Sequence, residues 1–156
     1  MLKIYIEGFG DLHLKYLLSD YTGTLSEDGT LIDGVGEKLS ILSNIFDEIH
    51  ILTADTFGTV SEQLKHYNVN IHILKGIVGE QKLKILQDFG AEYCAVIGNG
   101  NNDIQIASHA KVSIAVINKE GCSSNLIQHS DIVTCSIIDA LNLFINTKQL
   151  RATLRG

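Results

Sequence analysis

The chain has 156 residues, of which 45% are apolar, and this is about the length of one domain with a well-filled core. The formal net charge is −6, and the 12 lysine and arginine residues are scattered rather than grouped with aromatic residues, so nucleic-acid binding is not expected. No apolar run reaches the ~18 residues of a membrane span, and no cysteines form a Cys-x-x-Cys pair, so a cytoplasmic protein with reduced thiols is expected.

The first half of the chain predicts strands that alternate with helices. Residues 2–7 and 13–19 flank a glycine-containing turn and predict an N-terminal strand pair over residues 2–19. A turn signal at residues 26–30 predicts a small flap over about residues 24–33. The elements expected next are a helix at 35–46, a strand at 49–52, a helix from a Thr59 capping box to about residue 66, and a strand at 69–74.

The second half continues this alternation. The expected elements are a helix at 79–89 ended by Gly90, strands at 93–97, 112–116 and 132–133, helices ending near residues 109, 129 and 145, and a helix-prone tail from residue 148. Short strands that are apolar on both faces and alternate with helices are typical of a parallel sheet covered on both sides. The sequence therefore predicts an α/β fold, and residues 1–156 contain no linker or repeat that would divide them into domains.

Three polar clusters come directly after apolar strands: Asp20, Thr53 and the loop at residues 99–103. In an open α/β sheet, ligands bind at the carboxyl ends of the strands. A single residue of this kind is more often part of a turn or a helix cap. Three clusters at equivalent positions instead favour a common site at one edge of the sheet.

Lys82 lies near the middle of the apolar face of the helix at residues 79–89, whereas Lys84 lies on the opposite face. A lysine on the inward face has two interpretations. Its aliphatic part could run past the sheet edge and carry the ammonium group to solvent. Alternatively, the ammonium group could reach the same edge as Asp20.

The order of these residues along the chain resembles that of the haloacid dehalogenase (HAD) superfamily of aspartyl-phosphate phosphotransferases. More narrowly, it resembles the phosphorylation domain of P-type ATPases and its small soluble relatives. A phosphorelay receiver domain is a weaker match, because its acidic cluster starts at the first strand and its lysine comes last. The resemblance covers about residues 14 to 133, and the motifs that carry it are Asp20-Tyr21-Thr22-Gly23-Thr24-Leu25, Leu52-Thr53-Ala54-Asp55, Gly79-Glu80-Gln81-Lys82-Leu83-Lys84 and Gly98-Asn99-Gly100-Asn101-Asn102-Asp103.

The resemblance implies a three-layer, Rossmann-like parallel sheet with strand order 5-4-1-2-3 and no cap domain. It implies that Asp20 attacks a phosphoryl group and forms an aspartyl phosphate with the help of Mg²⁺. The residues to which it assigns catalysis are Asp20, Thr22, Thr53 and Lys82. The expected Mg²⁺ ligands are Asp20, Thr22, Asn99 and Asp103, and the expected phosphate-binding residues are Gly23, Thr53, Ala54 and Lys82.

Two positions depart from the pattern of the family's phosphatases. Thr22 stands where most of them have an aspartate that acts as general acid/base, and Asn99 stands where the relatives have an aspartate. Losing a positioned acid/base typically lowers the rate by ~10²–10⁴-fold. The expected function is therefore a slow Mg²⁺-dependent phosphatase or phosphotransferase. The alternative is a catalytically weakened regulatory module that binds phosphate or a partner.

The expected partner is a phosphorylated substrate whose identity the sequence does not reveal. Only a flap separates Asp20 from the helix at 35–46, and only a helix and a strand separate Thr53 from Lys82. A site without a cap implies either a large substrate or a neighbouring subunit that covers the site, so a homo-oligomer is expected.

Overall fold

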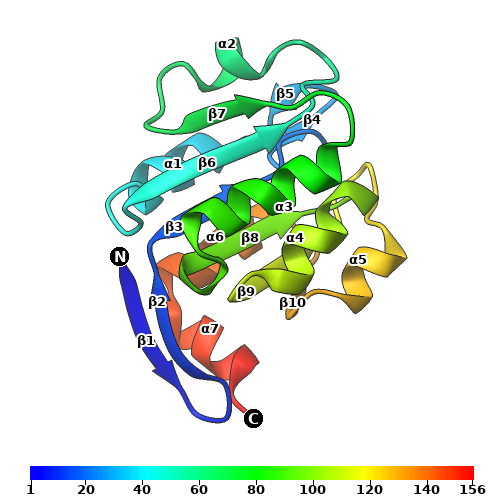
Figure 1. The fold of residues 1–156 in the computed structure, drawn as a ribbon. Coiled ribbons are helices and arrows are strands. Elements are labelled where there is room, and N and C mark those ends of the chain that lie inside the picture. The colour runs from blue at the N-terminus through cyan, green and yellow to red at the C-terminus, as the bar shows by residue number, and fades with distance from the viewer.

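The computed structural model describes all 156 residues. Its centre is a six-stranded sheet with the order β10-β9-β8-β3-β6-β7, in which every neighbouring pair is parallel (Figure 1). These strands are β3 (Tyr16–Ser19), β6 (Glu48–Thr53), β7 (Asn70–Ile73), β8 (Cys94–Gly98), β9 (Val112–Val116) and β10 (Ile132–Thr134). The predicted strand order 5-4-1-2-3 is confirmed as β9-β8-β3-β6-β7, and β10 adds a sixth strand at the edge beside β9.

The sheet is covered on both faces because its central strands are apolar on both sides. Leu17 of β3 belongs to the larger core cluster, which α1 (Val35–Leu42) and α6 (Ile137–Ile145) close. Leu18 belongs to a second cluster on the other face, where α3 (Val78–Phe89) and α4 (Ile104–His109) pack (Figure 1). The three-layer arrangement follows from this alternation.

The N-terminal strand pair differs from the prediction in its second strand. Strand β1 (Leu2–Ile6) pairs antiparallel with β2 (Gly10–Leu14), and β3 is a separate strand of the main sheet. The chain changes partners at Lys15, whose N–H donates to the carbonyl of Tyr93 and whose carbonyl accepts from the N–H of Asp47. The predicted strand at residues 13–19 was wrong because the apolar pattern continues through this change of partner.

A short hairpin of β4 (Ser26–Glu27) and β5 (Thr30–Leu31) occupies the predicted flap. The hydroxyl groups of Tyr21 and Thr59 both donate to the carbonyl of Gly29, at 2.9 and 2.6 Å, which fixes the flap. The predicted Thr59 capping box is therefore wrong. Asp55 caps α2 (Val60–Leu64) instead, since its Oδ1 accepts from the N–H groups of Thr59 and Val60.

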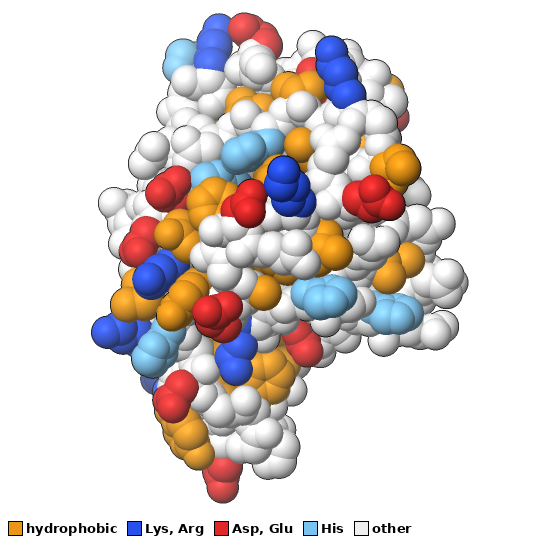
Figure 2. Space-filling view, in the orientation of Figure 1, with side chains coloured by type: hydrophobic (Ala, Val, Ile, Leu, Met, Phe, Trp, Pro, Cys, Tyr) orange, Lys and Arg blue, Asp and Glu red, His pale blue; other side chains and the backbone are white.

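The remaining elements are the 3₁₀ turns η1 (Ala91–Tyr93) and η2 (Asn101–Asp103) and the helices α5 (Ser124–Gln128) and α7 (Thr147–Leu154). Ser123 and Ser136 cap α5 and α6 through their hydroxyl oxygens. No cap domain lies over the carboxyl edge of the sheet. None of the helices has both the length and the apolar character that crossing a bilayer requires. On the face formed by α3 and α4, acidic and basic side chains are interspersed (Figure 2).

Candidate active site

Asp20 follows β3 and lies at the carboxyl edge of the sheet, between the ends of β6 and β8. The N–H of Asp20 continues the hydrogen-bond ladder of the sheet by donating to the carbonyl of Ile97, and Asp20 is only 9% exposed. Asp20 lines a cleft of about 240 Å³ together with Thr22, Thr53, Ala54, Thr56, Asn99, Gly100, Asn102 and Glu120. The three polar clusters that follow the strands therefore meet at one edge, as the sequence predicts.

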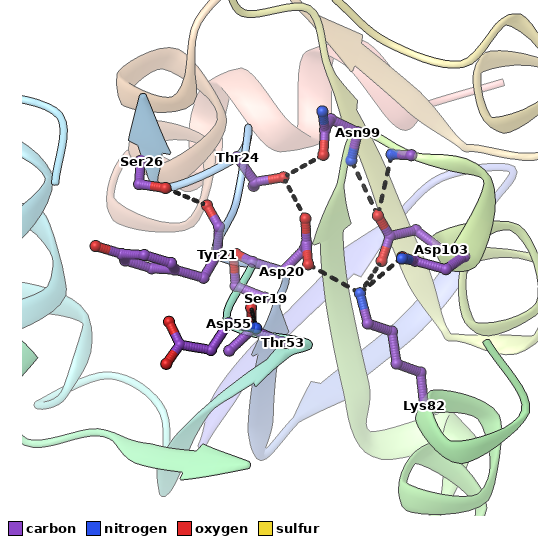
Figure 3. A network of polar contacts seen from close by, with 12 residues as sticks. Ser19, Asp20, Tyr21, Thr24, Ser26, Thr53, Asp55, Lys82, Asn99 and Asp103 are labelled. Carbon is purple, nitrogen blue, oxygen red and sulfur yellow. Dashed lines mark hydrogen bonds and ion pairs between the residues drawn. The ribbon is translucent and has the colours of Figure 1, made fainter. Parts of the chain in front are cut away.

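Lys82 lies beneath this cleft and joins two carboxylates (Figure 3). Its Nζ is 2.9 Å from Oδ1 of Asp20, 2.7 Å from Oδ1 of Asp103 and 2.9 Å from Oδ1 of Asn102. These three acceptors use all three donors of the ammonium group, and Lys82 is only 1% exposed. Of the two interpretations of the inward lysine, the structure shows the second, with the ammonium group beside Asp20.

Asp103 has both carboxylate oxygens engaged. While Oδ1 faces Lys82, Oδ2 accepts from the backbone N–H groups of Asn99 and Gly100, each at 3.1 Å. A side chain at Gly98 would collide with this carboxyl group, so glycine is required there. The Asp103 carboxylate thus fixes the conformation of the 98–103 loop and the position of Lys82.

The buried group of Asp20, Asp103 and Lys82 carries one more negative than positive charge. Burial and the neighbouring Asp103 together raise the pKa of Asp20 to about 7, against the opposing effect of the Lys82 ammonium. Burial by itself would lower the pKa of Lys82, but Asp103 and Asp20 outweigh it and raise that pKa, so the lysine stays charged. A further cation beside Asp20 would relieve the excess negative charge.

An oxygen cluster of four atoms lies on the other side of Asp20: Oδ2 of Asp20 itself, Oγ1 of Thr24, Oδ1 of Asn99 and the carbonyl oxygen of Thr22. Thr24 Oγ1 is 3.3 Å from Oδ2 of Asp20 and 3.1 Å from Oδ1 of Asn99 (Figure 3). In this orientation the Asn99 amide oxygen also faces Oδ2 of Asp20 and the carbonyl of Thr22, and neither group can donate to it. Turning the amide over would let its NH₂ donate to both, each at 3.2 Å. The site thus accepts either a cation between oxygens or an amide that donates to them.

Thr53 and Ala54 line the opposite side of the cleft. The hydroxyl oxygen of Thr53 accepts from the N–H of Asp55 at 2.9 Å, which leaves its O–H free to donate into the cleft. Thr22 differs, because its hydroxyl is buried and has no hydrogen-bond partner. Gly23 has φ of +77°, a conformation that favours glycine, and a Cβ there would lie 2.5 Å from the side chains of Asn99 and Glu120.

Sequence reasoning missed four residues that shape this site: Thr24, Asn102, Asn118 and Glu120. Thr24 and Asn102 lie inside the quoted motifs, but their contacts depend on side-chain directions that spacing does not give. Asn118 and Glu120 lie in the loop after β9, which lines the same edge of the sheet. That position was the available signal, because it follows an apolar strand just as Asp20 and Thr53 do.

Comparison with known proteins gives one relative in sequence and many in structure. No family model matches this chain. An uncharacterized protein of Methanocaldococcus jannaschii is 45% identical to it over 78 residues, which are 47% of this chain and 84% of that protein.

Solved structures match nearly the whole chain at low identity. The 3-deoxy-D-manno-octulosonate 8-phosphate phosphatase of Moraxella catarrhalis, in complex with magnesium, phosphate and KDO, has a TM-score of 0.72 at 20% identity, covering 92% of this chain and 94% of its own. The cobalt-bound phosphatase of Haemophilus influenzae has a TM-score of 0.72 at 13% identity and the same coverage. A haloacid dehalogenase-like hydrolase of Streptococcus pneumoniae has a TM-score of 0.63 at 12% identity, covering 85% of this chain and 99% of its own. Identities this low establish a common fold.

Proposed function

The chain belongs to the same family as the Methanocaldococcus jannaschii protein and has the haloacid dehalogenase fold, and we propose that it is a Mg²⁺-dependent phosphatase or phosphotransferase. The reaction would proceed through an aspartyl phosphate on Asp20. The observation that carries the proposal is the Asp20 carboxylate at the floor of the cleft, with Oδ1 held by the buried Lys82 and Oδ2 facing a group of oxygen atoms.

The oxygen cluster fits Mg²⁺. We assign Oδ2 of Asp20, the carbonyl oxygen of Thr22 and the amide oxygen of Asn99 as ligands, since Mg²⁺ prefers hard oxygen donors and keeps several waters. When bound, the ion would offset the charge of the phosphoryl group and of Asp20. Asp103 was also expected as a ligand, but we assign it to positioning Lys82, because both of its oxygens are already engaged.

The groups around Asp20 suit a phosphoryl group. Oδ1 is the oxygen left for attack on phosphorus, because Oδ2 belongs to the oxygen cluster. Lys82 offsets the charge at the point of attack, and the free O–H of Thr53 donates to a phosphoryl oxygen. We assign the backbone around Gly23 and Ala54 to the remaining phosphoryl oxygens. Phosphoryl transfer depends mainly on positioning and charge neutralisation of this kind.

The substrate is a phosphorylated compound. The neighbours named as 3-deoxy-D-manno-octulosonate 8-phosphate phosphatases support this class of substrate, at the level of fold alone. The three cysteines are unpaired, in agreement with the cytoplasmic location that we propose.

The alternative function, a module that binds phosphate or a partner without turnover, is favoured by one specific contact. With the Asn99 amide turned over, its NH₂ donates to Asp20 and to the carbonyl of Thr22. An aspartate at position 99 could not make these bonds. Asparagine in place of aspartate at position 99 therefore lets the amide NH₂ compete with Mg²⁺ for the oxygen cluster, which weakens metal binding.

Hydrolysis of an aryl phosphate distinguishes the two functions. We expect the wild type to release phosphate with added Mg²⁺ and to stop when EDTA is added, because the phosphoryl charge is then no longer offset. We expect no release by Asp20→Asn, whereas Asp88→Asn, which changes an exposed carboxylate on α3, should behave like the wild type. Equal hydrolysis by Asp20→Asn and the wild type would contradict the assignment of the nucleophile.

A second expected result concerns assembly. Nothing in the chain covers the cleft, so we propose that a second copy of the chain shields it in a homo-oligomer. Light scattering at the concentration used for the assay should give more than the monomer mass of 17.1 kDa. A monomer with full activity would show that the site works uncovered.

A further inference from the structure

We propose that Glu120 is the general acid/base of this reaction and replaces the aspartate that is missing at position 22. This inference rests on the proposed function, because it concerns proton transfer to and from the phosphoryl group on Asp20. It adds a catalytic residue that lies outside all four sequence motifs.

The Glu120 carboxylate lies beside the turn that carries Asp20. Glu120 lines the same cleft as Asp20, Thr22 and Thr53. Its Oε2 lies 2.5 Å from the point that a Cβ on Gly23 would occupy, next to the residue where an acid/base aspartate would stand. The carboxylate therefore reaches the turn that carries the nucleophile, although its own residue is about a hundred positions further along the chain.

The loop that carries Glu120 is fixed to this turn by hydrogen bonds. Asn118 donates through Nδ2 to the carbonyls of Gly23 and Thr24, at 3.1 and 2.8 Å. On the other side, the N–H of Ser123 donates to the carbonyl of Asn99 at 2.8 Å. Bonds on both sides of Glu120 thus tie its loop to the strands that carry Asp20 and Asn99.

Glu120 is the free carboxylate in the cleft. It takes part in no ion pair, whereas the neighbouring Lys119 pairs with Glu27 at 3.2 Å. The other acidic groups nearby are engaged, since Asp103 holds Lys82 and Asp55 caps α2. Glu120 is also exposed, so it can exchange protons with solvent.

The chemistry balances with Glu120 in both steps. In the first, Oδ1 of Asp20 forms a bond to phosphorus, the bond to the leaving oxygen breaks, and protonated Glu120 gives its proton to that oxygen. In the second, the Glu120 carboxylate takes a proton from water while the water oxygen bonds to phosphorus. The bond between phosphorus and Asp20 then breaks, which returns the aspartate and releases phosphate.

The test separates formation of the phosphoenzyme from its hydrolysis. The protein is mixed with acetyl phosphate and Mg²⁺, quenched in acid at intervals, and its intact mass is measured. We expect Glu120→Gln to form the phosphoenzyme at nearly the wild-type rate, because acetyl phosphate needs little protonation of its leaving group. Its hydrolysis should slow by about 10²-fold, the lower end of general acid/base effects. Glu92→Gln, an exposed glutamate before β8, should match the wild type in both steps.

A rescue variant makes the test specific. In Glu120→Gln with Thr22→Asp, the new aspartate should restore hydrolysis to at least the wild-type rate, because the proton acceptor is again beside the phosphoryl group. Equal hydrolysis by the wild type and Glu120→Gln would overturn the role of Glu120 and leave the proposed function intact. A lower affinity for Mg²⁺ alone would show that Glu120 holds the ion instead. It would be seen as a Mg²⁺ titration shifted to higher concentration with unchanged rates at saturation. No phosphoenzyme in any variant would overturn the proposed function itself.

Discussion

Replacing Asp20 with asparagine is expected to stabilise the metal-free protein while it abolishes turnover. Folding buries the Asp20 carboxylate near Asp103 and raises its pKa from 3.8 to about 7. An asparagine keeps the shape and can still accept from Lys82, but it carries no charge to bury. At 1.36 kcal/mol per pKa unit, the gain in the free energy of unfolding at pH 8 is about 4 kcal/mol.

The sign and pH range of this effect follow from the direction of the shift. A carboxyl group with a raised pKa in the folded state binds protons more tightly there than in the unfolded chain, so stability falls as the pH rises from 3.8 to about 7. The advantage of Asp20→Asn should therefore be complete above pH 7 and should shrink by more than half by pH 5. It should vanish only below about pH 3, where the carboxyl group is protonated in both states.

Urea unfolding in EDTA at a series of pH values measures this advantage. Asp88→Asn is the matched control, because its carboxylate is exposed and should change stability by less than about 0.5 kcal/mol at any pH. Adding Mg²⁺ should then stabilise the wild type and leave Asp20→Asn unchanged, since only the wild type would bind the ion. A wild type that is more stable than Asp20→Asn at pH 8 without metal would contradict the electrostatic account of the site.

Replacing Thr22 with aspartate is expected to raise steady-state turnover by about 10²-fold, near the lower end of the range for a positioned acid/base. In the wild type, phosphorylation of Asp20 needs only a good leaving group, whereas hydrolysis needs a water to lose a proton. Glu120 reaches the cleft from an exposed loop, so we expect hydrolysis to be the slow step and the phosphoenzyme to accumulate. A carboxylate at position 22 would act from the turn that carries the nucleophile.

Thr22→Asn separates proton transfer from a change of size. Asparagine has the shape of aspartate but accepts no proton under these conditions, so it should give no gain in phosphate release. The buried hydroxyl of Thr22 has no hydrogen-bond partner, so neither substitution breaks a bond of that group. Equal gains from the two variants, or slower release by Thr22→Asp, would show that hydrolysis is not limited by the lack of a carboxylate at position 22.

Much of the fold could be predicted because the strands are buried on both faces and therefore apolar throughout. The order of β3 to β9 was predicted by resemblance and is found in the structure. The strand at residues 13–19 was mispredicted since both of its halves are apolar, and only the partners of Lys15 reveal where one sheet ends and the next begins. The Thr59 capping box was also mispredicted, because the Thr59 hydroxyl donates to the carbonyl of Gly29 in the flap.

The site could be predicted as far as helical and strand periodicity determine direction. Lys82 lies on the apolar face of α3 and points to Asp20, which the 3.6-residue period predicts once the sheet edge is known. Periodicity says nothing of loops. Asp103 Oδ2 accepts two backbone hydrogen bonds only because of the turn at residues 98–103. The Glu120 carboxylate lies in the cleft because Asn118 ties its loop to the turn at Gly23. Such contacts come from tertiary structure and leave no local pattern.

Peptide mapping after an acid quench shows whether Asp20 itself becomes phosphorylated. The wild type is mixed with acetyl phosphate and Mg²⁺, quenched within seconds, digested with pepsin at low pH, and analysed by mass spectrometry. We expect one phosphoryl group on the peptide that contains Asp20, absent in EDTA and absent in Asp20→Asn. A phosphoryl group on another residue, or steady phosphate release with no phosphorylated peptide at any time, would contradict this expectation.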